Sequence, residues 1–272
     1  SWDILSGYTG YISFGHSALS GVAAYTTALL LFNIDPGMSI LITFPLSVLF
    51  ALIVGLLFAF PALRLKGPYF SLITLLSVLI LIRLVFILSD YTRGELGIGE
   101  VPIISFDYTM VYYVTFLPMI LIVSVLFYIS RSDIGNVFVA IRENEYAVEA
   151  AGLDTTKFKL WAFTLSAIPM GIGGTLLAHF YGNVDPATVL EVERSIEMVM
   201  MAIIGGTGTI LGPVVGAYIF ILLRDIVFTS FLGSTERWIA LWSVVLVILV
   251  VANDGIVYRL WNKIGELGGE KE

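Results

Sequence analysis

Two glycine-rich stretches, one near each end of the chain, contain the residue types most suited to contacting a small polar ligand. The first covers residues 7–21 and the second covers residues 205–216. In an apolar helix, glycine permits close contact between helices, and it also allows the helix to unwind where freed backbone groups face a cavity. Paired segments of this kind in two halves of a chain are typical of a ligand site near the middle of a membrane. The alternative interpretation is tight helix packing alone.

Exposed backbone amides and short hydroxyl groups in these stretches suit a zwitterionic ligand. The N-terminus of a half-helix holds a carboxylate through its dipole and its free N–H groups. Ser13 and Thr207 would then orient an ammonium group or line the path, while an aliphatic side chain would need only apolar walls. We therefore predict a substrate pathway bordered by Gly10, Ser13, Gly15, His16, Gly205, Gly206, Thr207 and Gly208.

The chain has two histidines and no cysteine, which excludes disulfides and thiolate metal sites. His16 is either a pore-lining hydrogen-bonding residue, less often a proton carrier, or a packing residue whose ring nitrogens are satisfied. His179 is interpreted as interfacial. The sequence has no phosphate-binding loop of the GxxxxGKS/T type, so we expect no ATP binding by that route. We expect no metal, no cofactor and no catalytic residue.

A charged segment, residues 136–152, has a different character. Its apolar residues recur at helical spacing, interrupted only by Asn144, and its charged residues lie largely on other faces. These charges forbid a membrane span, and Gly152 is a suitable helix C-cap. An amphipathic helix lying on the bilayer is one interpretation. The polar side is acidic, however, which an anionic leaflet would repel, so docking into the groove of a partner protein is favoured.

The composition decides which solvent surrounds the elements that position these residues. Apolar residues make up 58% of the 272 residues and charged residues only 13%, and the mean hydropathy is +0.96. A soluble domain is about 45–50% apolar and about 25% charged. The chain is therefore predicted to be an all-α polytopic membrane protein.

The sequence predicts about seven to eight transmembrane segments within a single domain, residues 1–272. A hydrocarbon core about 30 Å thick requires roughly 20 apolar residues in a helix. Residues 196–204 are shorter than this, residues 205–209 interrupt them, and residues 212–231 continue, which indicates a short or broken helix followed by a full span. Because the chain begins at Ser1 directly before an ordered motif, we expect that an N-terminal span precedes it. The clearest spans are Tyr11–Phe32, Met38–Leu63, Tyr69–Ser89, Met110–Ser130, Phe158–Tyr181 and Trp238–Ala252.

Lys and Arg residues in the loops predict the orientation. Most of them, including those of residues 131–159 and of the C-terminus, fall on one side if the spans alternate, so both segments are predicted to be cytoplasmic. The opposite loops are acidic. The net charge of −7 argues against nucleic acid as a partner. Arg83 and Arg224 lie inside apolar runs and are interpreted as snorkelling to the interface, or for Arg224 as pairing with Asp225.

The chain resembles the permeases of branched-chain amino acid ABC transporters, and most closely the larger of the two permease types. The resemblance rests on several motifs that occur in the expected order over nearly the whole chain. They are Gly15-His16 with the following Gly-x-Ala-Ala-Tyr run, Pro61-Ala62-Leu63-Arg64-Leu65-Lys66-Gly67-Pro68-Tyr69, Ala140-Ile141-Arg142-Glu143-Asn144-Glu145 with Glu149-Ala150-Ala151-Gly152, and Ser195-Ile196-Glu197 leading to Gly205-Gly206-Thr207-Gly208-Thr209.

The resemblance implies a subunit that helps to form a pore and does not itself hydrolyse ATP. Glu149-Ala150-Ala151-Gly152 resembles the cytoplasmic motif that packs against an ATPase subunit. The implied partners are a second permease, two ATP-binding cassette ATPases, an extracytoplasmic substrate-binding protein and membrane lipid, in a prokaryotic inner membrane. The implied coupling segment spans about residues 131–157, and its coupling residues are Arg142, Glu143, Asn144, Glu145, Glu149, Ala150, Ala151 and Gly152.

Two departures from the family pattern bear on the substrate. Residues 93–97 read Arg-Gly-Glu-Leu-Gly where Gly-Gly-x-x-Gly is common, and residues 253–255 read Asn-Asp-Gly where Arg-Pro-x-Gly is common. Related permeases for urea or short amides share most of the motifs and remain an alternative. A self-contained secondary transporter is another, but such proteins keep ionisable residues deep in the membrane, and we place none of the 21 Asp and Glu residues near the centre of a span. A channel is disfavoured because one filter-like run gives no ring symmetry.

Overall fold

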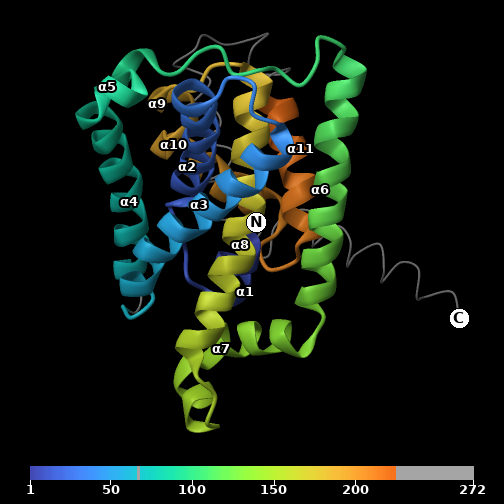
Figure 1. Ribbon diagram of the computed structural model, residues 1–272. Helices are drawn as coiled ribbons and strands as arrows, with labels where there is room; N and C mark the ends of the chain where they lie inside the picture. Colours follow the sequence, from blue (N-terminus) through green and yellow to red (C-terminus); the bar gives the residue numbers. More distant parts are fainter. Residues whose placement is uncertain (66–67, 225–272) are drawn as a thin grey trace, which may run out of the picture.

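A computed structural model describes residues 1–65 and 68–224 of the protein (Figure 1). Within these ranges every regular element is helical, apart from a single antiparallel bridge between Ile98 and Val184. The predicted span Trp238–Ala252 and the C-terminus lie outside the described residues. The all-α prediction is confirmed for the part of the chain that is described.

Five helices in this part are long and apolar enough to cross a membrane. Polar residues at their ends set the limits: the side chains of Ser39, Asp107 and Asp154 accept hydrogen bonds from backbone N–H groups in the first turns of the helices that follow them. The five are α2 with its π-helical extension (His16–Ile34), α3 (Ile40–Ala62), α4 (Pro68–Ile87), α6 (Tyr108–Ser130) and α8 (Thr155–Tyr181).

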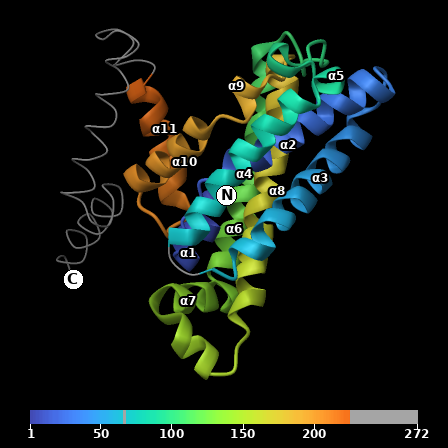
Figure 2. The same cartoon turned by 90° about the vertical axis from the view of Figure 1, so that its left-hand side faces the viewer.

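Helix α8 is the central element, and α2 and α3 pack against it (Figures 1 and 2). Small residues permit this contact, since a Cβ at Gly174 would overlap the carbonyl group of Ser20, and one at Gly171 would lie 3.2 Å from the Cα of Val48. Helix α6 stands at one side of the bundle, and Leu126 is its one buried residue. The broadly apolar surface of α6 is therefore suited to lipid.

The first predicted span begins later than expected. Helix α1 (Trp2–Thr9) ends at Gly10, which adopts a left-handed conformation with φ of 77°, and α2 (His16–Leu29) starts only at His16. The prediction of one helix from Tyr11 to Phe32 is wrong at its N-terminal end, because residues 10–15 are not helical. This is a break of the kind that the glycines were expected to allow.

The second glycine-rich stretch lies at the turn of a hairpin of two short helices. Helix α10 (Val192–Gly205) and helix α11 (Leu211–Leu222) lie side by side and antiparallel (Figures 1 and 2). Their backbones touch because a Cβ at Gly205 would overlap the carbonyl oxygen of Gly212 and one at Gly216 would overlap that of Met201. The prediction of a short helix is confirmed for α10, and the chain then reverses direction. Whether α11 extends to residue 231 lies outside the described residues.

The charged segment forms helix α7 (Asp133–Ala150), which lies across one end of the bundle, here called the α7 end (Figures 1 and 2). Its backbone breaks at Asn144, where φ is −159° and ψ is 95°. Gly152 follows with φ of 85°, as a cap glycine does. The short helices α5 (Ser89–Thr92) and α9 (Pro186–Val189), and the turn Gly94–Leu96, lie at the opposite end.

Candidate functional site

The side chain of Asp3 joins α1, the helix before the first break, to the second glycine-rich break. Its carboxylate accepts hydrogen bonds from the backbone N–H groups of Gly208 at 2.7 Å, Thr209 at 3.1 Å and Ile210 at 3.1 Å. Positive φ angles at Gly206, Gly208 and Ile210 shape this loop into a concave set of donors. An internal carboxylate therefore occupies the amides at the N-terminus of α11.

The first break is held by side chains of α1 and α4. Irregular backbone at membrane depth must find hydrogen-bond partners, because each unsatisfied group costs several kcal/mol in hydrocarbon. Residues 12–14 find theirs in neighbouring side chains, so the break is a defined local structure. The bonds run from Trp2 Nε1 to Ser13 O (2.7 Å), from Ser13 N to Ser6 Oγ (3.1 Å), from Phe14 N to Thr74 Oγ1 (3.1 Å) and from Ser71 Oγ to Ile12 O (2.6 Å).

The predicted pathway residues fall into two groups. Gly10 and Thr207 are exposed and Gly208 is half-buried. The others are buried, namely Ser13, Gly15, His16, Gly205 and Gly206. The free amides expected to hold a ligand carboxylate are occupied in this structure, in the second break by Asp3 and in the first by side-chain hydroxyl groups.

His16 is fully buried, and both of its ring nitrogens have partners. Nδ1 lies 3.1 Å from Ser13 Oγ, and Nε2 lies 2.6 Å from Ser166 Oγ. This geometry favours the packing interpretation. His179 is also buried, and its Nδ1 lies 2.7 Å from the carbonyl oxygen of Pro102. His179, in the last turn of α8, therefore contacts the loop that contains Pro102.

Arg224, which lies just beyond α11, pairs within the α10–α11 hairpin. Its Nη1 donates to Glu197 Oε1 at 2.9 Å. This contact joins the outer turns of α10 and α11 across the hairpin. Asp225, the alternative partner that the sequence suggested, lies outside the described residues. Arg224 therefore has a carboxylate partner within the described residues, as the pairing interpretation expected, although with a different residue.

Arg142 of α7 lies against both breaks. Its Nη1 donates to the carbonyl oxygen of Gly7 at 2.8 Å. A Cβ at Gly10 would lie 3.0 Å from Arg142 Cγ, and a Cβ at Gly208 would lie 2.9 Å from Arg142 Nη1. Arg142 also pairs with Glu143 at 3.1 Å. Glycine at positions 10 and 208 therefore leaves the space that the arginine side chain fills.

Glu145, also on α7, belongs to a second cluster at the α7 end. Tyr11 Oη donates to Glu145 Oε2 at 2.6 Å, and Lys159 Nζ donates to Glu145 Oε1 at 2.8 Å and to Tyr11 Oη at 3.1 Å. Burial, together with the Glu145 carboxylate, raises the pKa of the Tyr11 phenol, so Tyr11 keeps its proton and acts as a donor. Thr155 donates to Glu145 at 3.3 Å and to Glu149 at 2.9 Å.

Sequence reasoning missed Asp3, Tyr11, Thr155 and Lys159 as members of these clusters. Two signals were available. Asp3 is an acidic residue directly before an apolar stretch, and Lys159 follows a charged segment at the start of a long apolar helix. Neither signal identifies a partner, because Gly208 and Glu145 become neighbours only through the fold.

The other predicted coupling residues point away from the bundle. The side chain of Glu143 is 69% exposed, and the other five of these residues are exposed with it. These are Asn144, Glu149, Ala150, Ala151 and Gly152. We call α7 together with the turn that follows it, residues 133–152, the α7 segment. This segment has an inner side that contacts the breaks and an outer side that is exposed.

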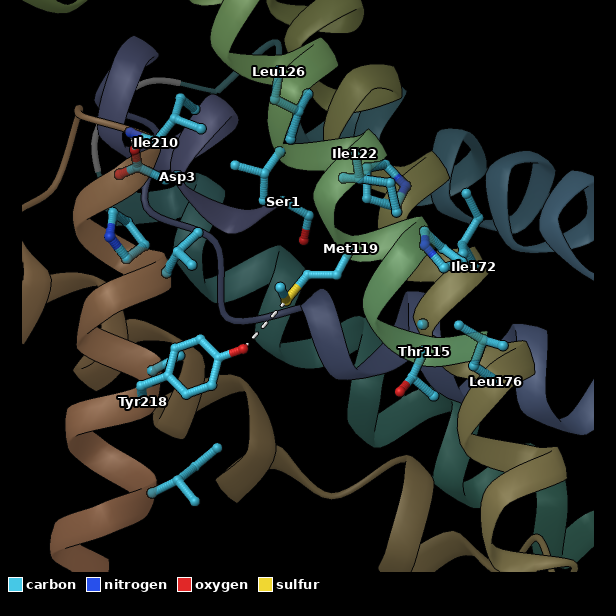
Figure 3. A pocket seen from close by; sticks show the side chains of 18 residues that line it. Ser1, Asp3, Thr115, Met119, Ile122, Leu126, Ile172, Leu176, Ile210 and Tyr218 are labelled. Carbon is cyan, nitrogen blue, oxygen red and sulfur yellow. Dashed lines mark hydrogen bonds between the residues drawn. The ribbon is translucent and has the colours of Figure 1, made fainter. Parts of the chain in front are cut away.

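An apolar cavity of 510 Å³ lies between α6, α8 and α11 (Figure 3). Ile122 and Leu126 line it from α6, and Ile172 and Leu176 line it from α8. Asp3 lies on its wall beside Ile210. Tyr218 Oη, from α11, donates to Met119 Sδ at 3.9 Å across the cavity. The volume lies within the range of about 300–1,000 Å³ that is typical of small-molecule sites.

Comparison with known proteins places this architecture in a family. The sequence profile described as "Branched-chain amino acid transport system / permease component" matches residues 1–252. The chain belongs to this family. The resemblance inferred from the motifs is thereby confirmed, and this family of transport permeases is not one of enzymes.

Individual permeases of this family show how far the similarity extends. The chain is 27% identical over 253 residues to the high-affinity branched-chain amino acid transport system permease protein LivM of Salmonella typhimurium, covering 82% of this chain and 59% of that protein. The LivM protein of Escherichia coli K12 is 28% identical over the same coverage. The chain thus spans about three-fifths of the length of these relatives.

A second type of permease is also similar to the chain. The LivH protein of Escherichia coli K12 is 23% identical over 150 residues, covering 55% of this chain and 47% of that protein. No solved structure matches the chain. The family is therefore established by sequence, and the helical arrangement comes from the present structure.

Proposed function

We propose that the chain is a membrane-spanning permease subunit of an ABC importer, and that it forms part of the translocation pathway for branched-chain or related hydrophobic amino acids. The observation that carries this proposal is the family match over residues 1–252. The helices that could cross a membrane support it. Residues 1–272 would form one transmembrane domain with about seven to eight spans, counting those outside the described residues. The urea and short-amide permeases are the alternative within the family.

The substrate pathway is proposed to run along the two glycine-rich breaks. Gly10, Thr207 and Gly208 are accessible and would border it. The buried residues of the set would lie behind those that border the pathway and would support them. They are Ser13, Gly15, His16, Gly205 and Gly206. The adjoining apolar cavity offers the walls that an aliphatic side chain requires.

The outer side of the α7 segment is proposed to receive the ATPase. Its exposed Glu143, Asn144 and residues 149–152 are supported in this role by two observations. They lie beyond the end of the bundle, and they use few hydrogen bonds within the chain. The α7 end and the C-terminus would then be cytoplasmic, in the inner membrane of a prokaryotic cell.

The full importer would contain a second permease, two ATP-binding cassette ATPases and an extracytoplasmic substrate-binding protein. The relatives named LivM and LivH support the presence of two permease types. ATP hydrolysis would take place on the ATPase subunits.

Detergent extraction of the tagged chain from its native membrane, followed by identification of the bound proteins, tests the proposal. We expect a second permease and P-loop ATPases to be recovered, and we expect reconstituted vesicles to accumulate labelled leucine, isoleucine or valine when ATP is present. Recovery of the chain alone, with uptake driven by an ion gradient, would contradict the proposal and indicate a secondary transporter. Uptake of urea in preference to leucine would correct the substrate.

A further inference from the structure

The α7 segment contacts the break between α1 and α2, residues 10–15, through buried side chains. Phe138 and Ile141 anchor the first part of α7 in the core, and Val148 anchors the second part. They belong to the same buried cluster as Tyr8 and Tyr11 of the N-terminal region. The helix is therefore packed directly on the segment that contains the break, and the two cannot move independently without opening this core.

Two polar contacts fix the register between α7 and the break. Arg142 holds the carbonyl oxygen of Gly7 at 2.8 Å, and its stem fills the space above Gly10. Glu145 accepts a hydrogen bond from the phenol of Tyr11 at 2.6 Å. Helix α7 therefore holds the chain on both sides of Gly10, the glycine at which α1 ends: at Gly7 in the last part of α1 and at Tyr11 in the break.

The kink in α7 separates these two contacts. Arg142 precedes Asn144 and Glu145 follows it, so each contact belongs to a different part of α7. The side chain of Asn144 accepts from the backbone N–H of Ala147 at 3.1 Å, which caps the second part as a helix of its own. A change in the angle at Asn144 would therefore displace Gly7 relative to Tyr11.

Gly7 also links the first break to the second. A Cβ at Gly7 would overlap Asp3 Oδ1 and would lie 2.6 Å from the backbone nitrogen of Gly208. The Arg142 guanidinium, the Gly7 backbone and the Gly208 loop thus form one continuous contact. A displacement of Arg142 would therefore move both breaks, because no flexible element lies between them and the arginine.

We propose that Arg142, Glu145 and Tyr11 transmit movement of the α7 segment to the α1–α2 break and, through Gly7, to the Gly206–Ile210 loop. This inference rests on the proposed function. It assigns to Arg142 and Glu145 a positioning role inside the permease, distinct from contact with the ATPase, which is left to the outward-facing residues. Tyr11 is a positioning residue that the sequence did not suggest.

The test uses the complete importer reconstituted in vesicles and compares uptake with ATP hydrolysis. Arg142→Ala should lower the amount of substrate transported per ATP hydrolysed by about fivefold or more, the lower limit of typical coupling between distant sites, while the ATPases remain bound. Tyr11→Phe removes the hydrogen bonds of the phenol to Glu145 and Lys159 and keeps the ring that packs edge-on against Phe70, and it should give a smaller loss. Arg142→Lys retains a donor and should restore part of the coupling.

Matched controls separate coupling from general damage. Arg64→Ala removes an exposed arginine that lies over the ring of Phe60, and Tyr128→Phe removes an exposed phenol of α6. Both should keep the wild-type ratio of uptake to hydrolysis. If Arg142→Ala does not assemble, Tyr11→Phe and Arg142→Lys decide the question.

A spin label gives a readout that a structural role would not change. The chain has no cysteine, so Ile12→Cys, at a position 47% exposed within the break, can be labelled alone. ATP with vanadate should alter its spectrum in the wild-type background and in Arg64→Ala, but not in Arg142→Ala. Equal spectral responses and equal coupling ratios in Arg142→Ala and Arg64→Ala would overturn the inference, as would a label that never responds in an importer that retains its ATPases. Absence of any ATPase from the wild-type complex would instead overturn the proposed function.

Discussion

The carboxylate of Asp3 accepts a 2.7 Å hydrogen bond from the backbone N–H of Gly208, 205 positions later in the chain. The same carboxylate also holds the N–H groups of Thr209 and Ile210. It therefore satisfies donors that would otherwise be unpaired where α11 begins. This contact joins the N-terminal helix to the reversal of the α10–α11 hairpin.

Replacement of Asp3 should destabilise the protein in proportion to the acceptors removed. Asp3→Ala leaves three N–H groups without their acceptor, two of them partly buried and that of Ile210 buried, and should cost about 3 kcal/mol or more, whereas Asp3→Asn keeps one oxygen and should cost about 1–2 kcal/mol. Denaturation in mixed micelles followed by helical circular dichroism measures both. Asp90→Ala, at an exposed position, is the control. Equal stability of Asp3→Ala and Asp90→Ala would refute the stabilisation of the loop at residues 208–210 by Asp3.

The contact between α10 and α11 should depend on the absence of a side chain at Gly205. A Cβ at Gly205 would overlap the backbone of Gly212, and backbone cannot yield as a flexible side chain can. Gly205→Ala should therefore lower the free energy of unfolding by about 2–3 kcal/mol or more. Gly173→Ala in α8 meets nothing within 4 Å, and it should be neutral or stabilise by up to about 1 kcal/mol. The same micelle assay should separate the two variants, and a Gly205→Ala protein as stable as Gly173→Ala would show that the helices do not pack in this way.

The pair formed by Lys159 and Glu145 should behave as a unit. Their side chains are 3% and 13% exposed, and Nζ lies 2.8 Å from Oε1. Lys159→Met alone leaves a largely buried carboxylate without its cation and should cost about 3 kcal/mol. The double variant Lys159→Met with Glu145→Gln should cost less than the two single losses added together. Strict additivity in the double-mutant cycle would argue against a direct interaction.

His16 should matter for stability and not for proton coupling. Both ring nitrogens are bonded within the protein, to Ser13 and to Ser166. His16→Ala should destabilise the fold by about 2–3 kcal/mol because it leaves a cavity and unpaired hydroxyl groups. The pH profile of ATP-driven uptake by His16→Gln should match that of the wild type across the range in which histidine titrates. A profile that loses an inflection in His16→Gln would indicate a proton carrier instead.

Glu149 should affect transport without affecting the fold. It is exposed, and Thr155 donates to it at 2.9 Å. Loss of this single surface contact should cost less than about 1 kcal/mol, whereas Glu149→Arg reverses the charge on the proposed ATPase-docking surface and should abolish uptake. Quantitative recovery of the ATPases with the tagged variant measures the docking. Glu149→Gln is the milder comparison, and uptake at the wild-type rate by Glu149→Arg would remove Glu149 from the docking surface.

The sequence by itself determined the class of the protein and the positions at which its helices break. Its apolar composition requires lipid or an equivalent solvent, and long apolar runs with polar ends become helices because no other open structure satisfies the backbone in a membrane. The glycines at positions 10, 206 and 208 mark both breaks, since they permit positive φ. The order of motifs was enough to identify the family.

Only the tertiary structure decided which groups these breaks contact. The sequence suggested free amides for a ligand, but hydrogen bonds from Gly208 to Asp3 and from Phe14 to Thr74 occupy such amides. It also assigned Arg142 and Glu143 one common role, whereas the fold turns Arg142 onto Gly7 and leaves Glu143 exposed. Helical periodicity sets which residues share a face, but the direction of that face depends on packing against α8 and against α1, which is distant in the sequence. The physical reason is that long-range contacts are specified jointly by many residues and not by any local pattern.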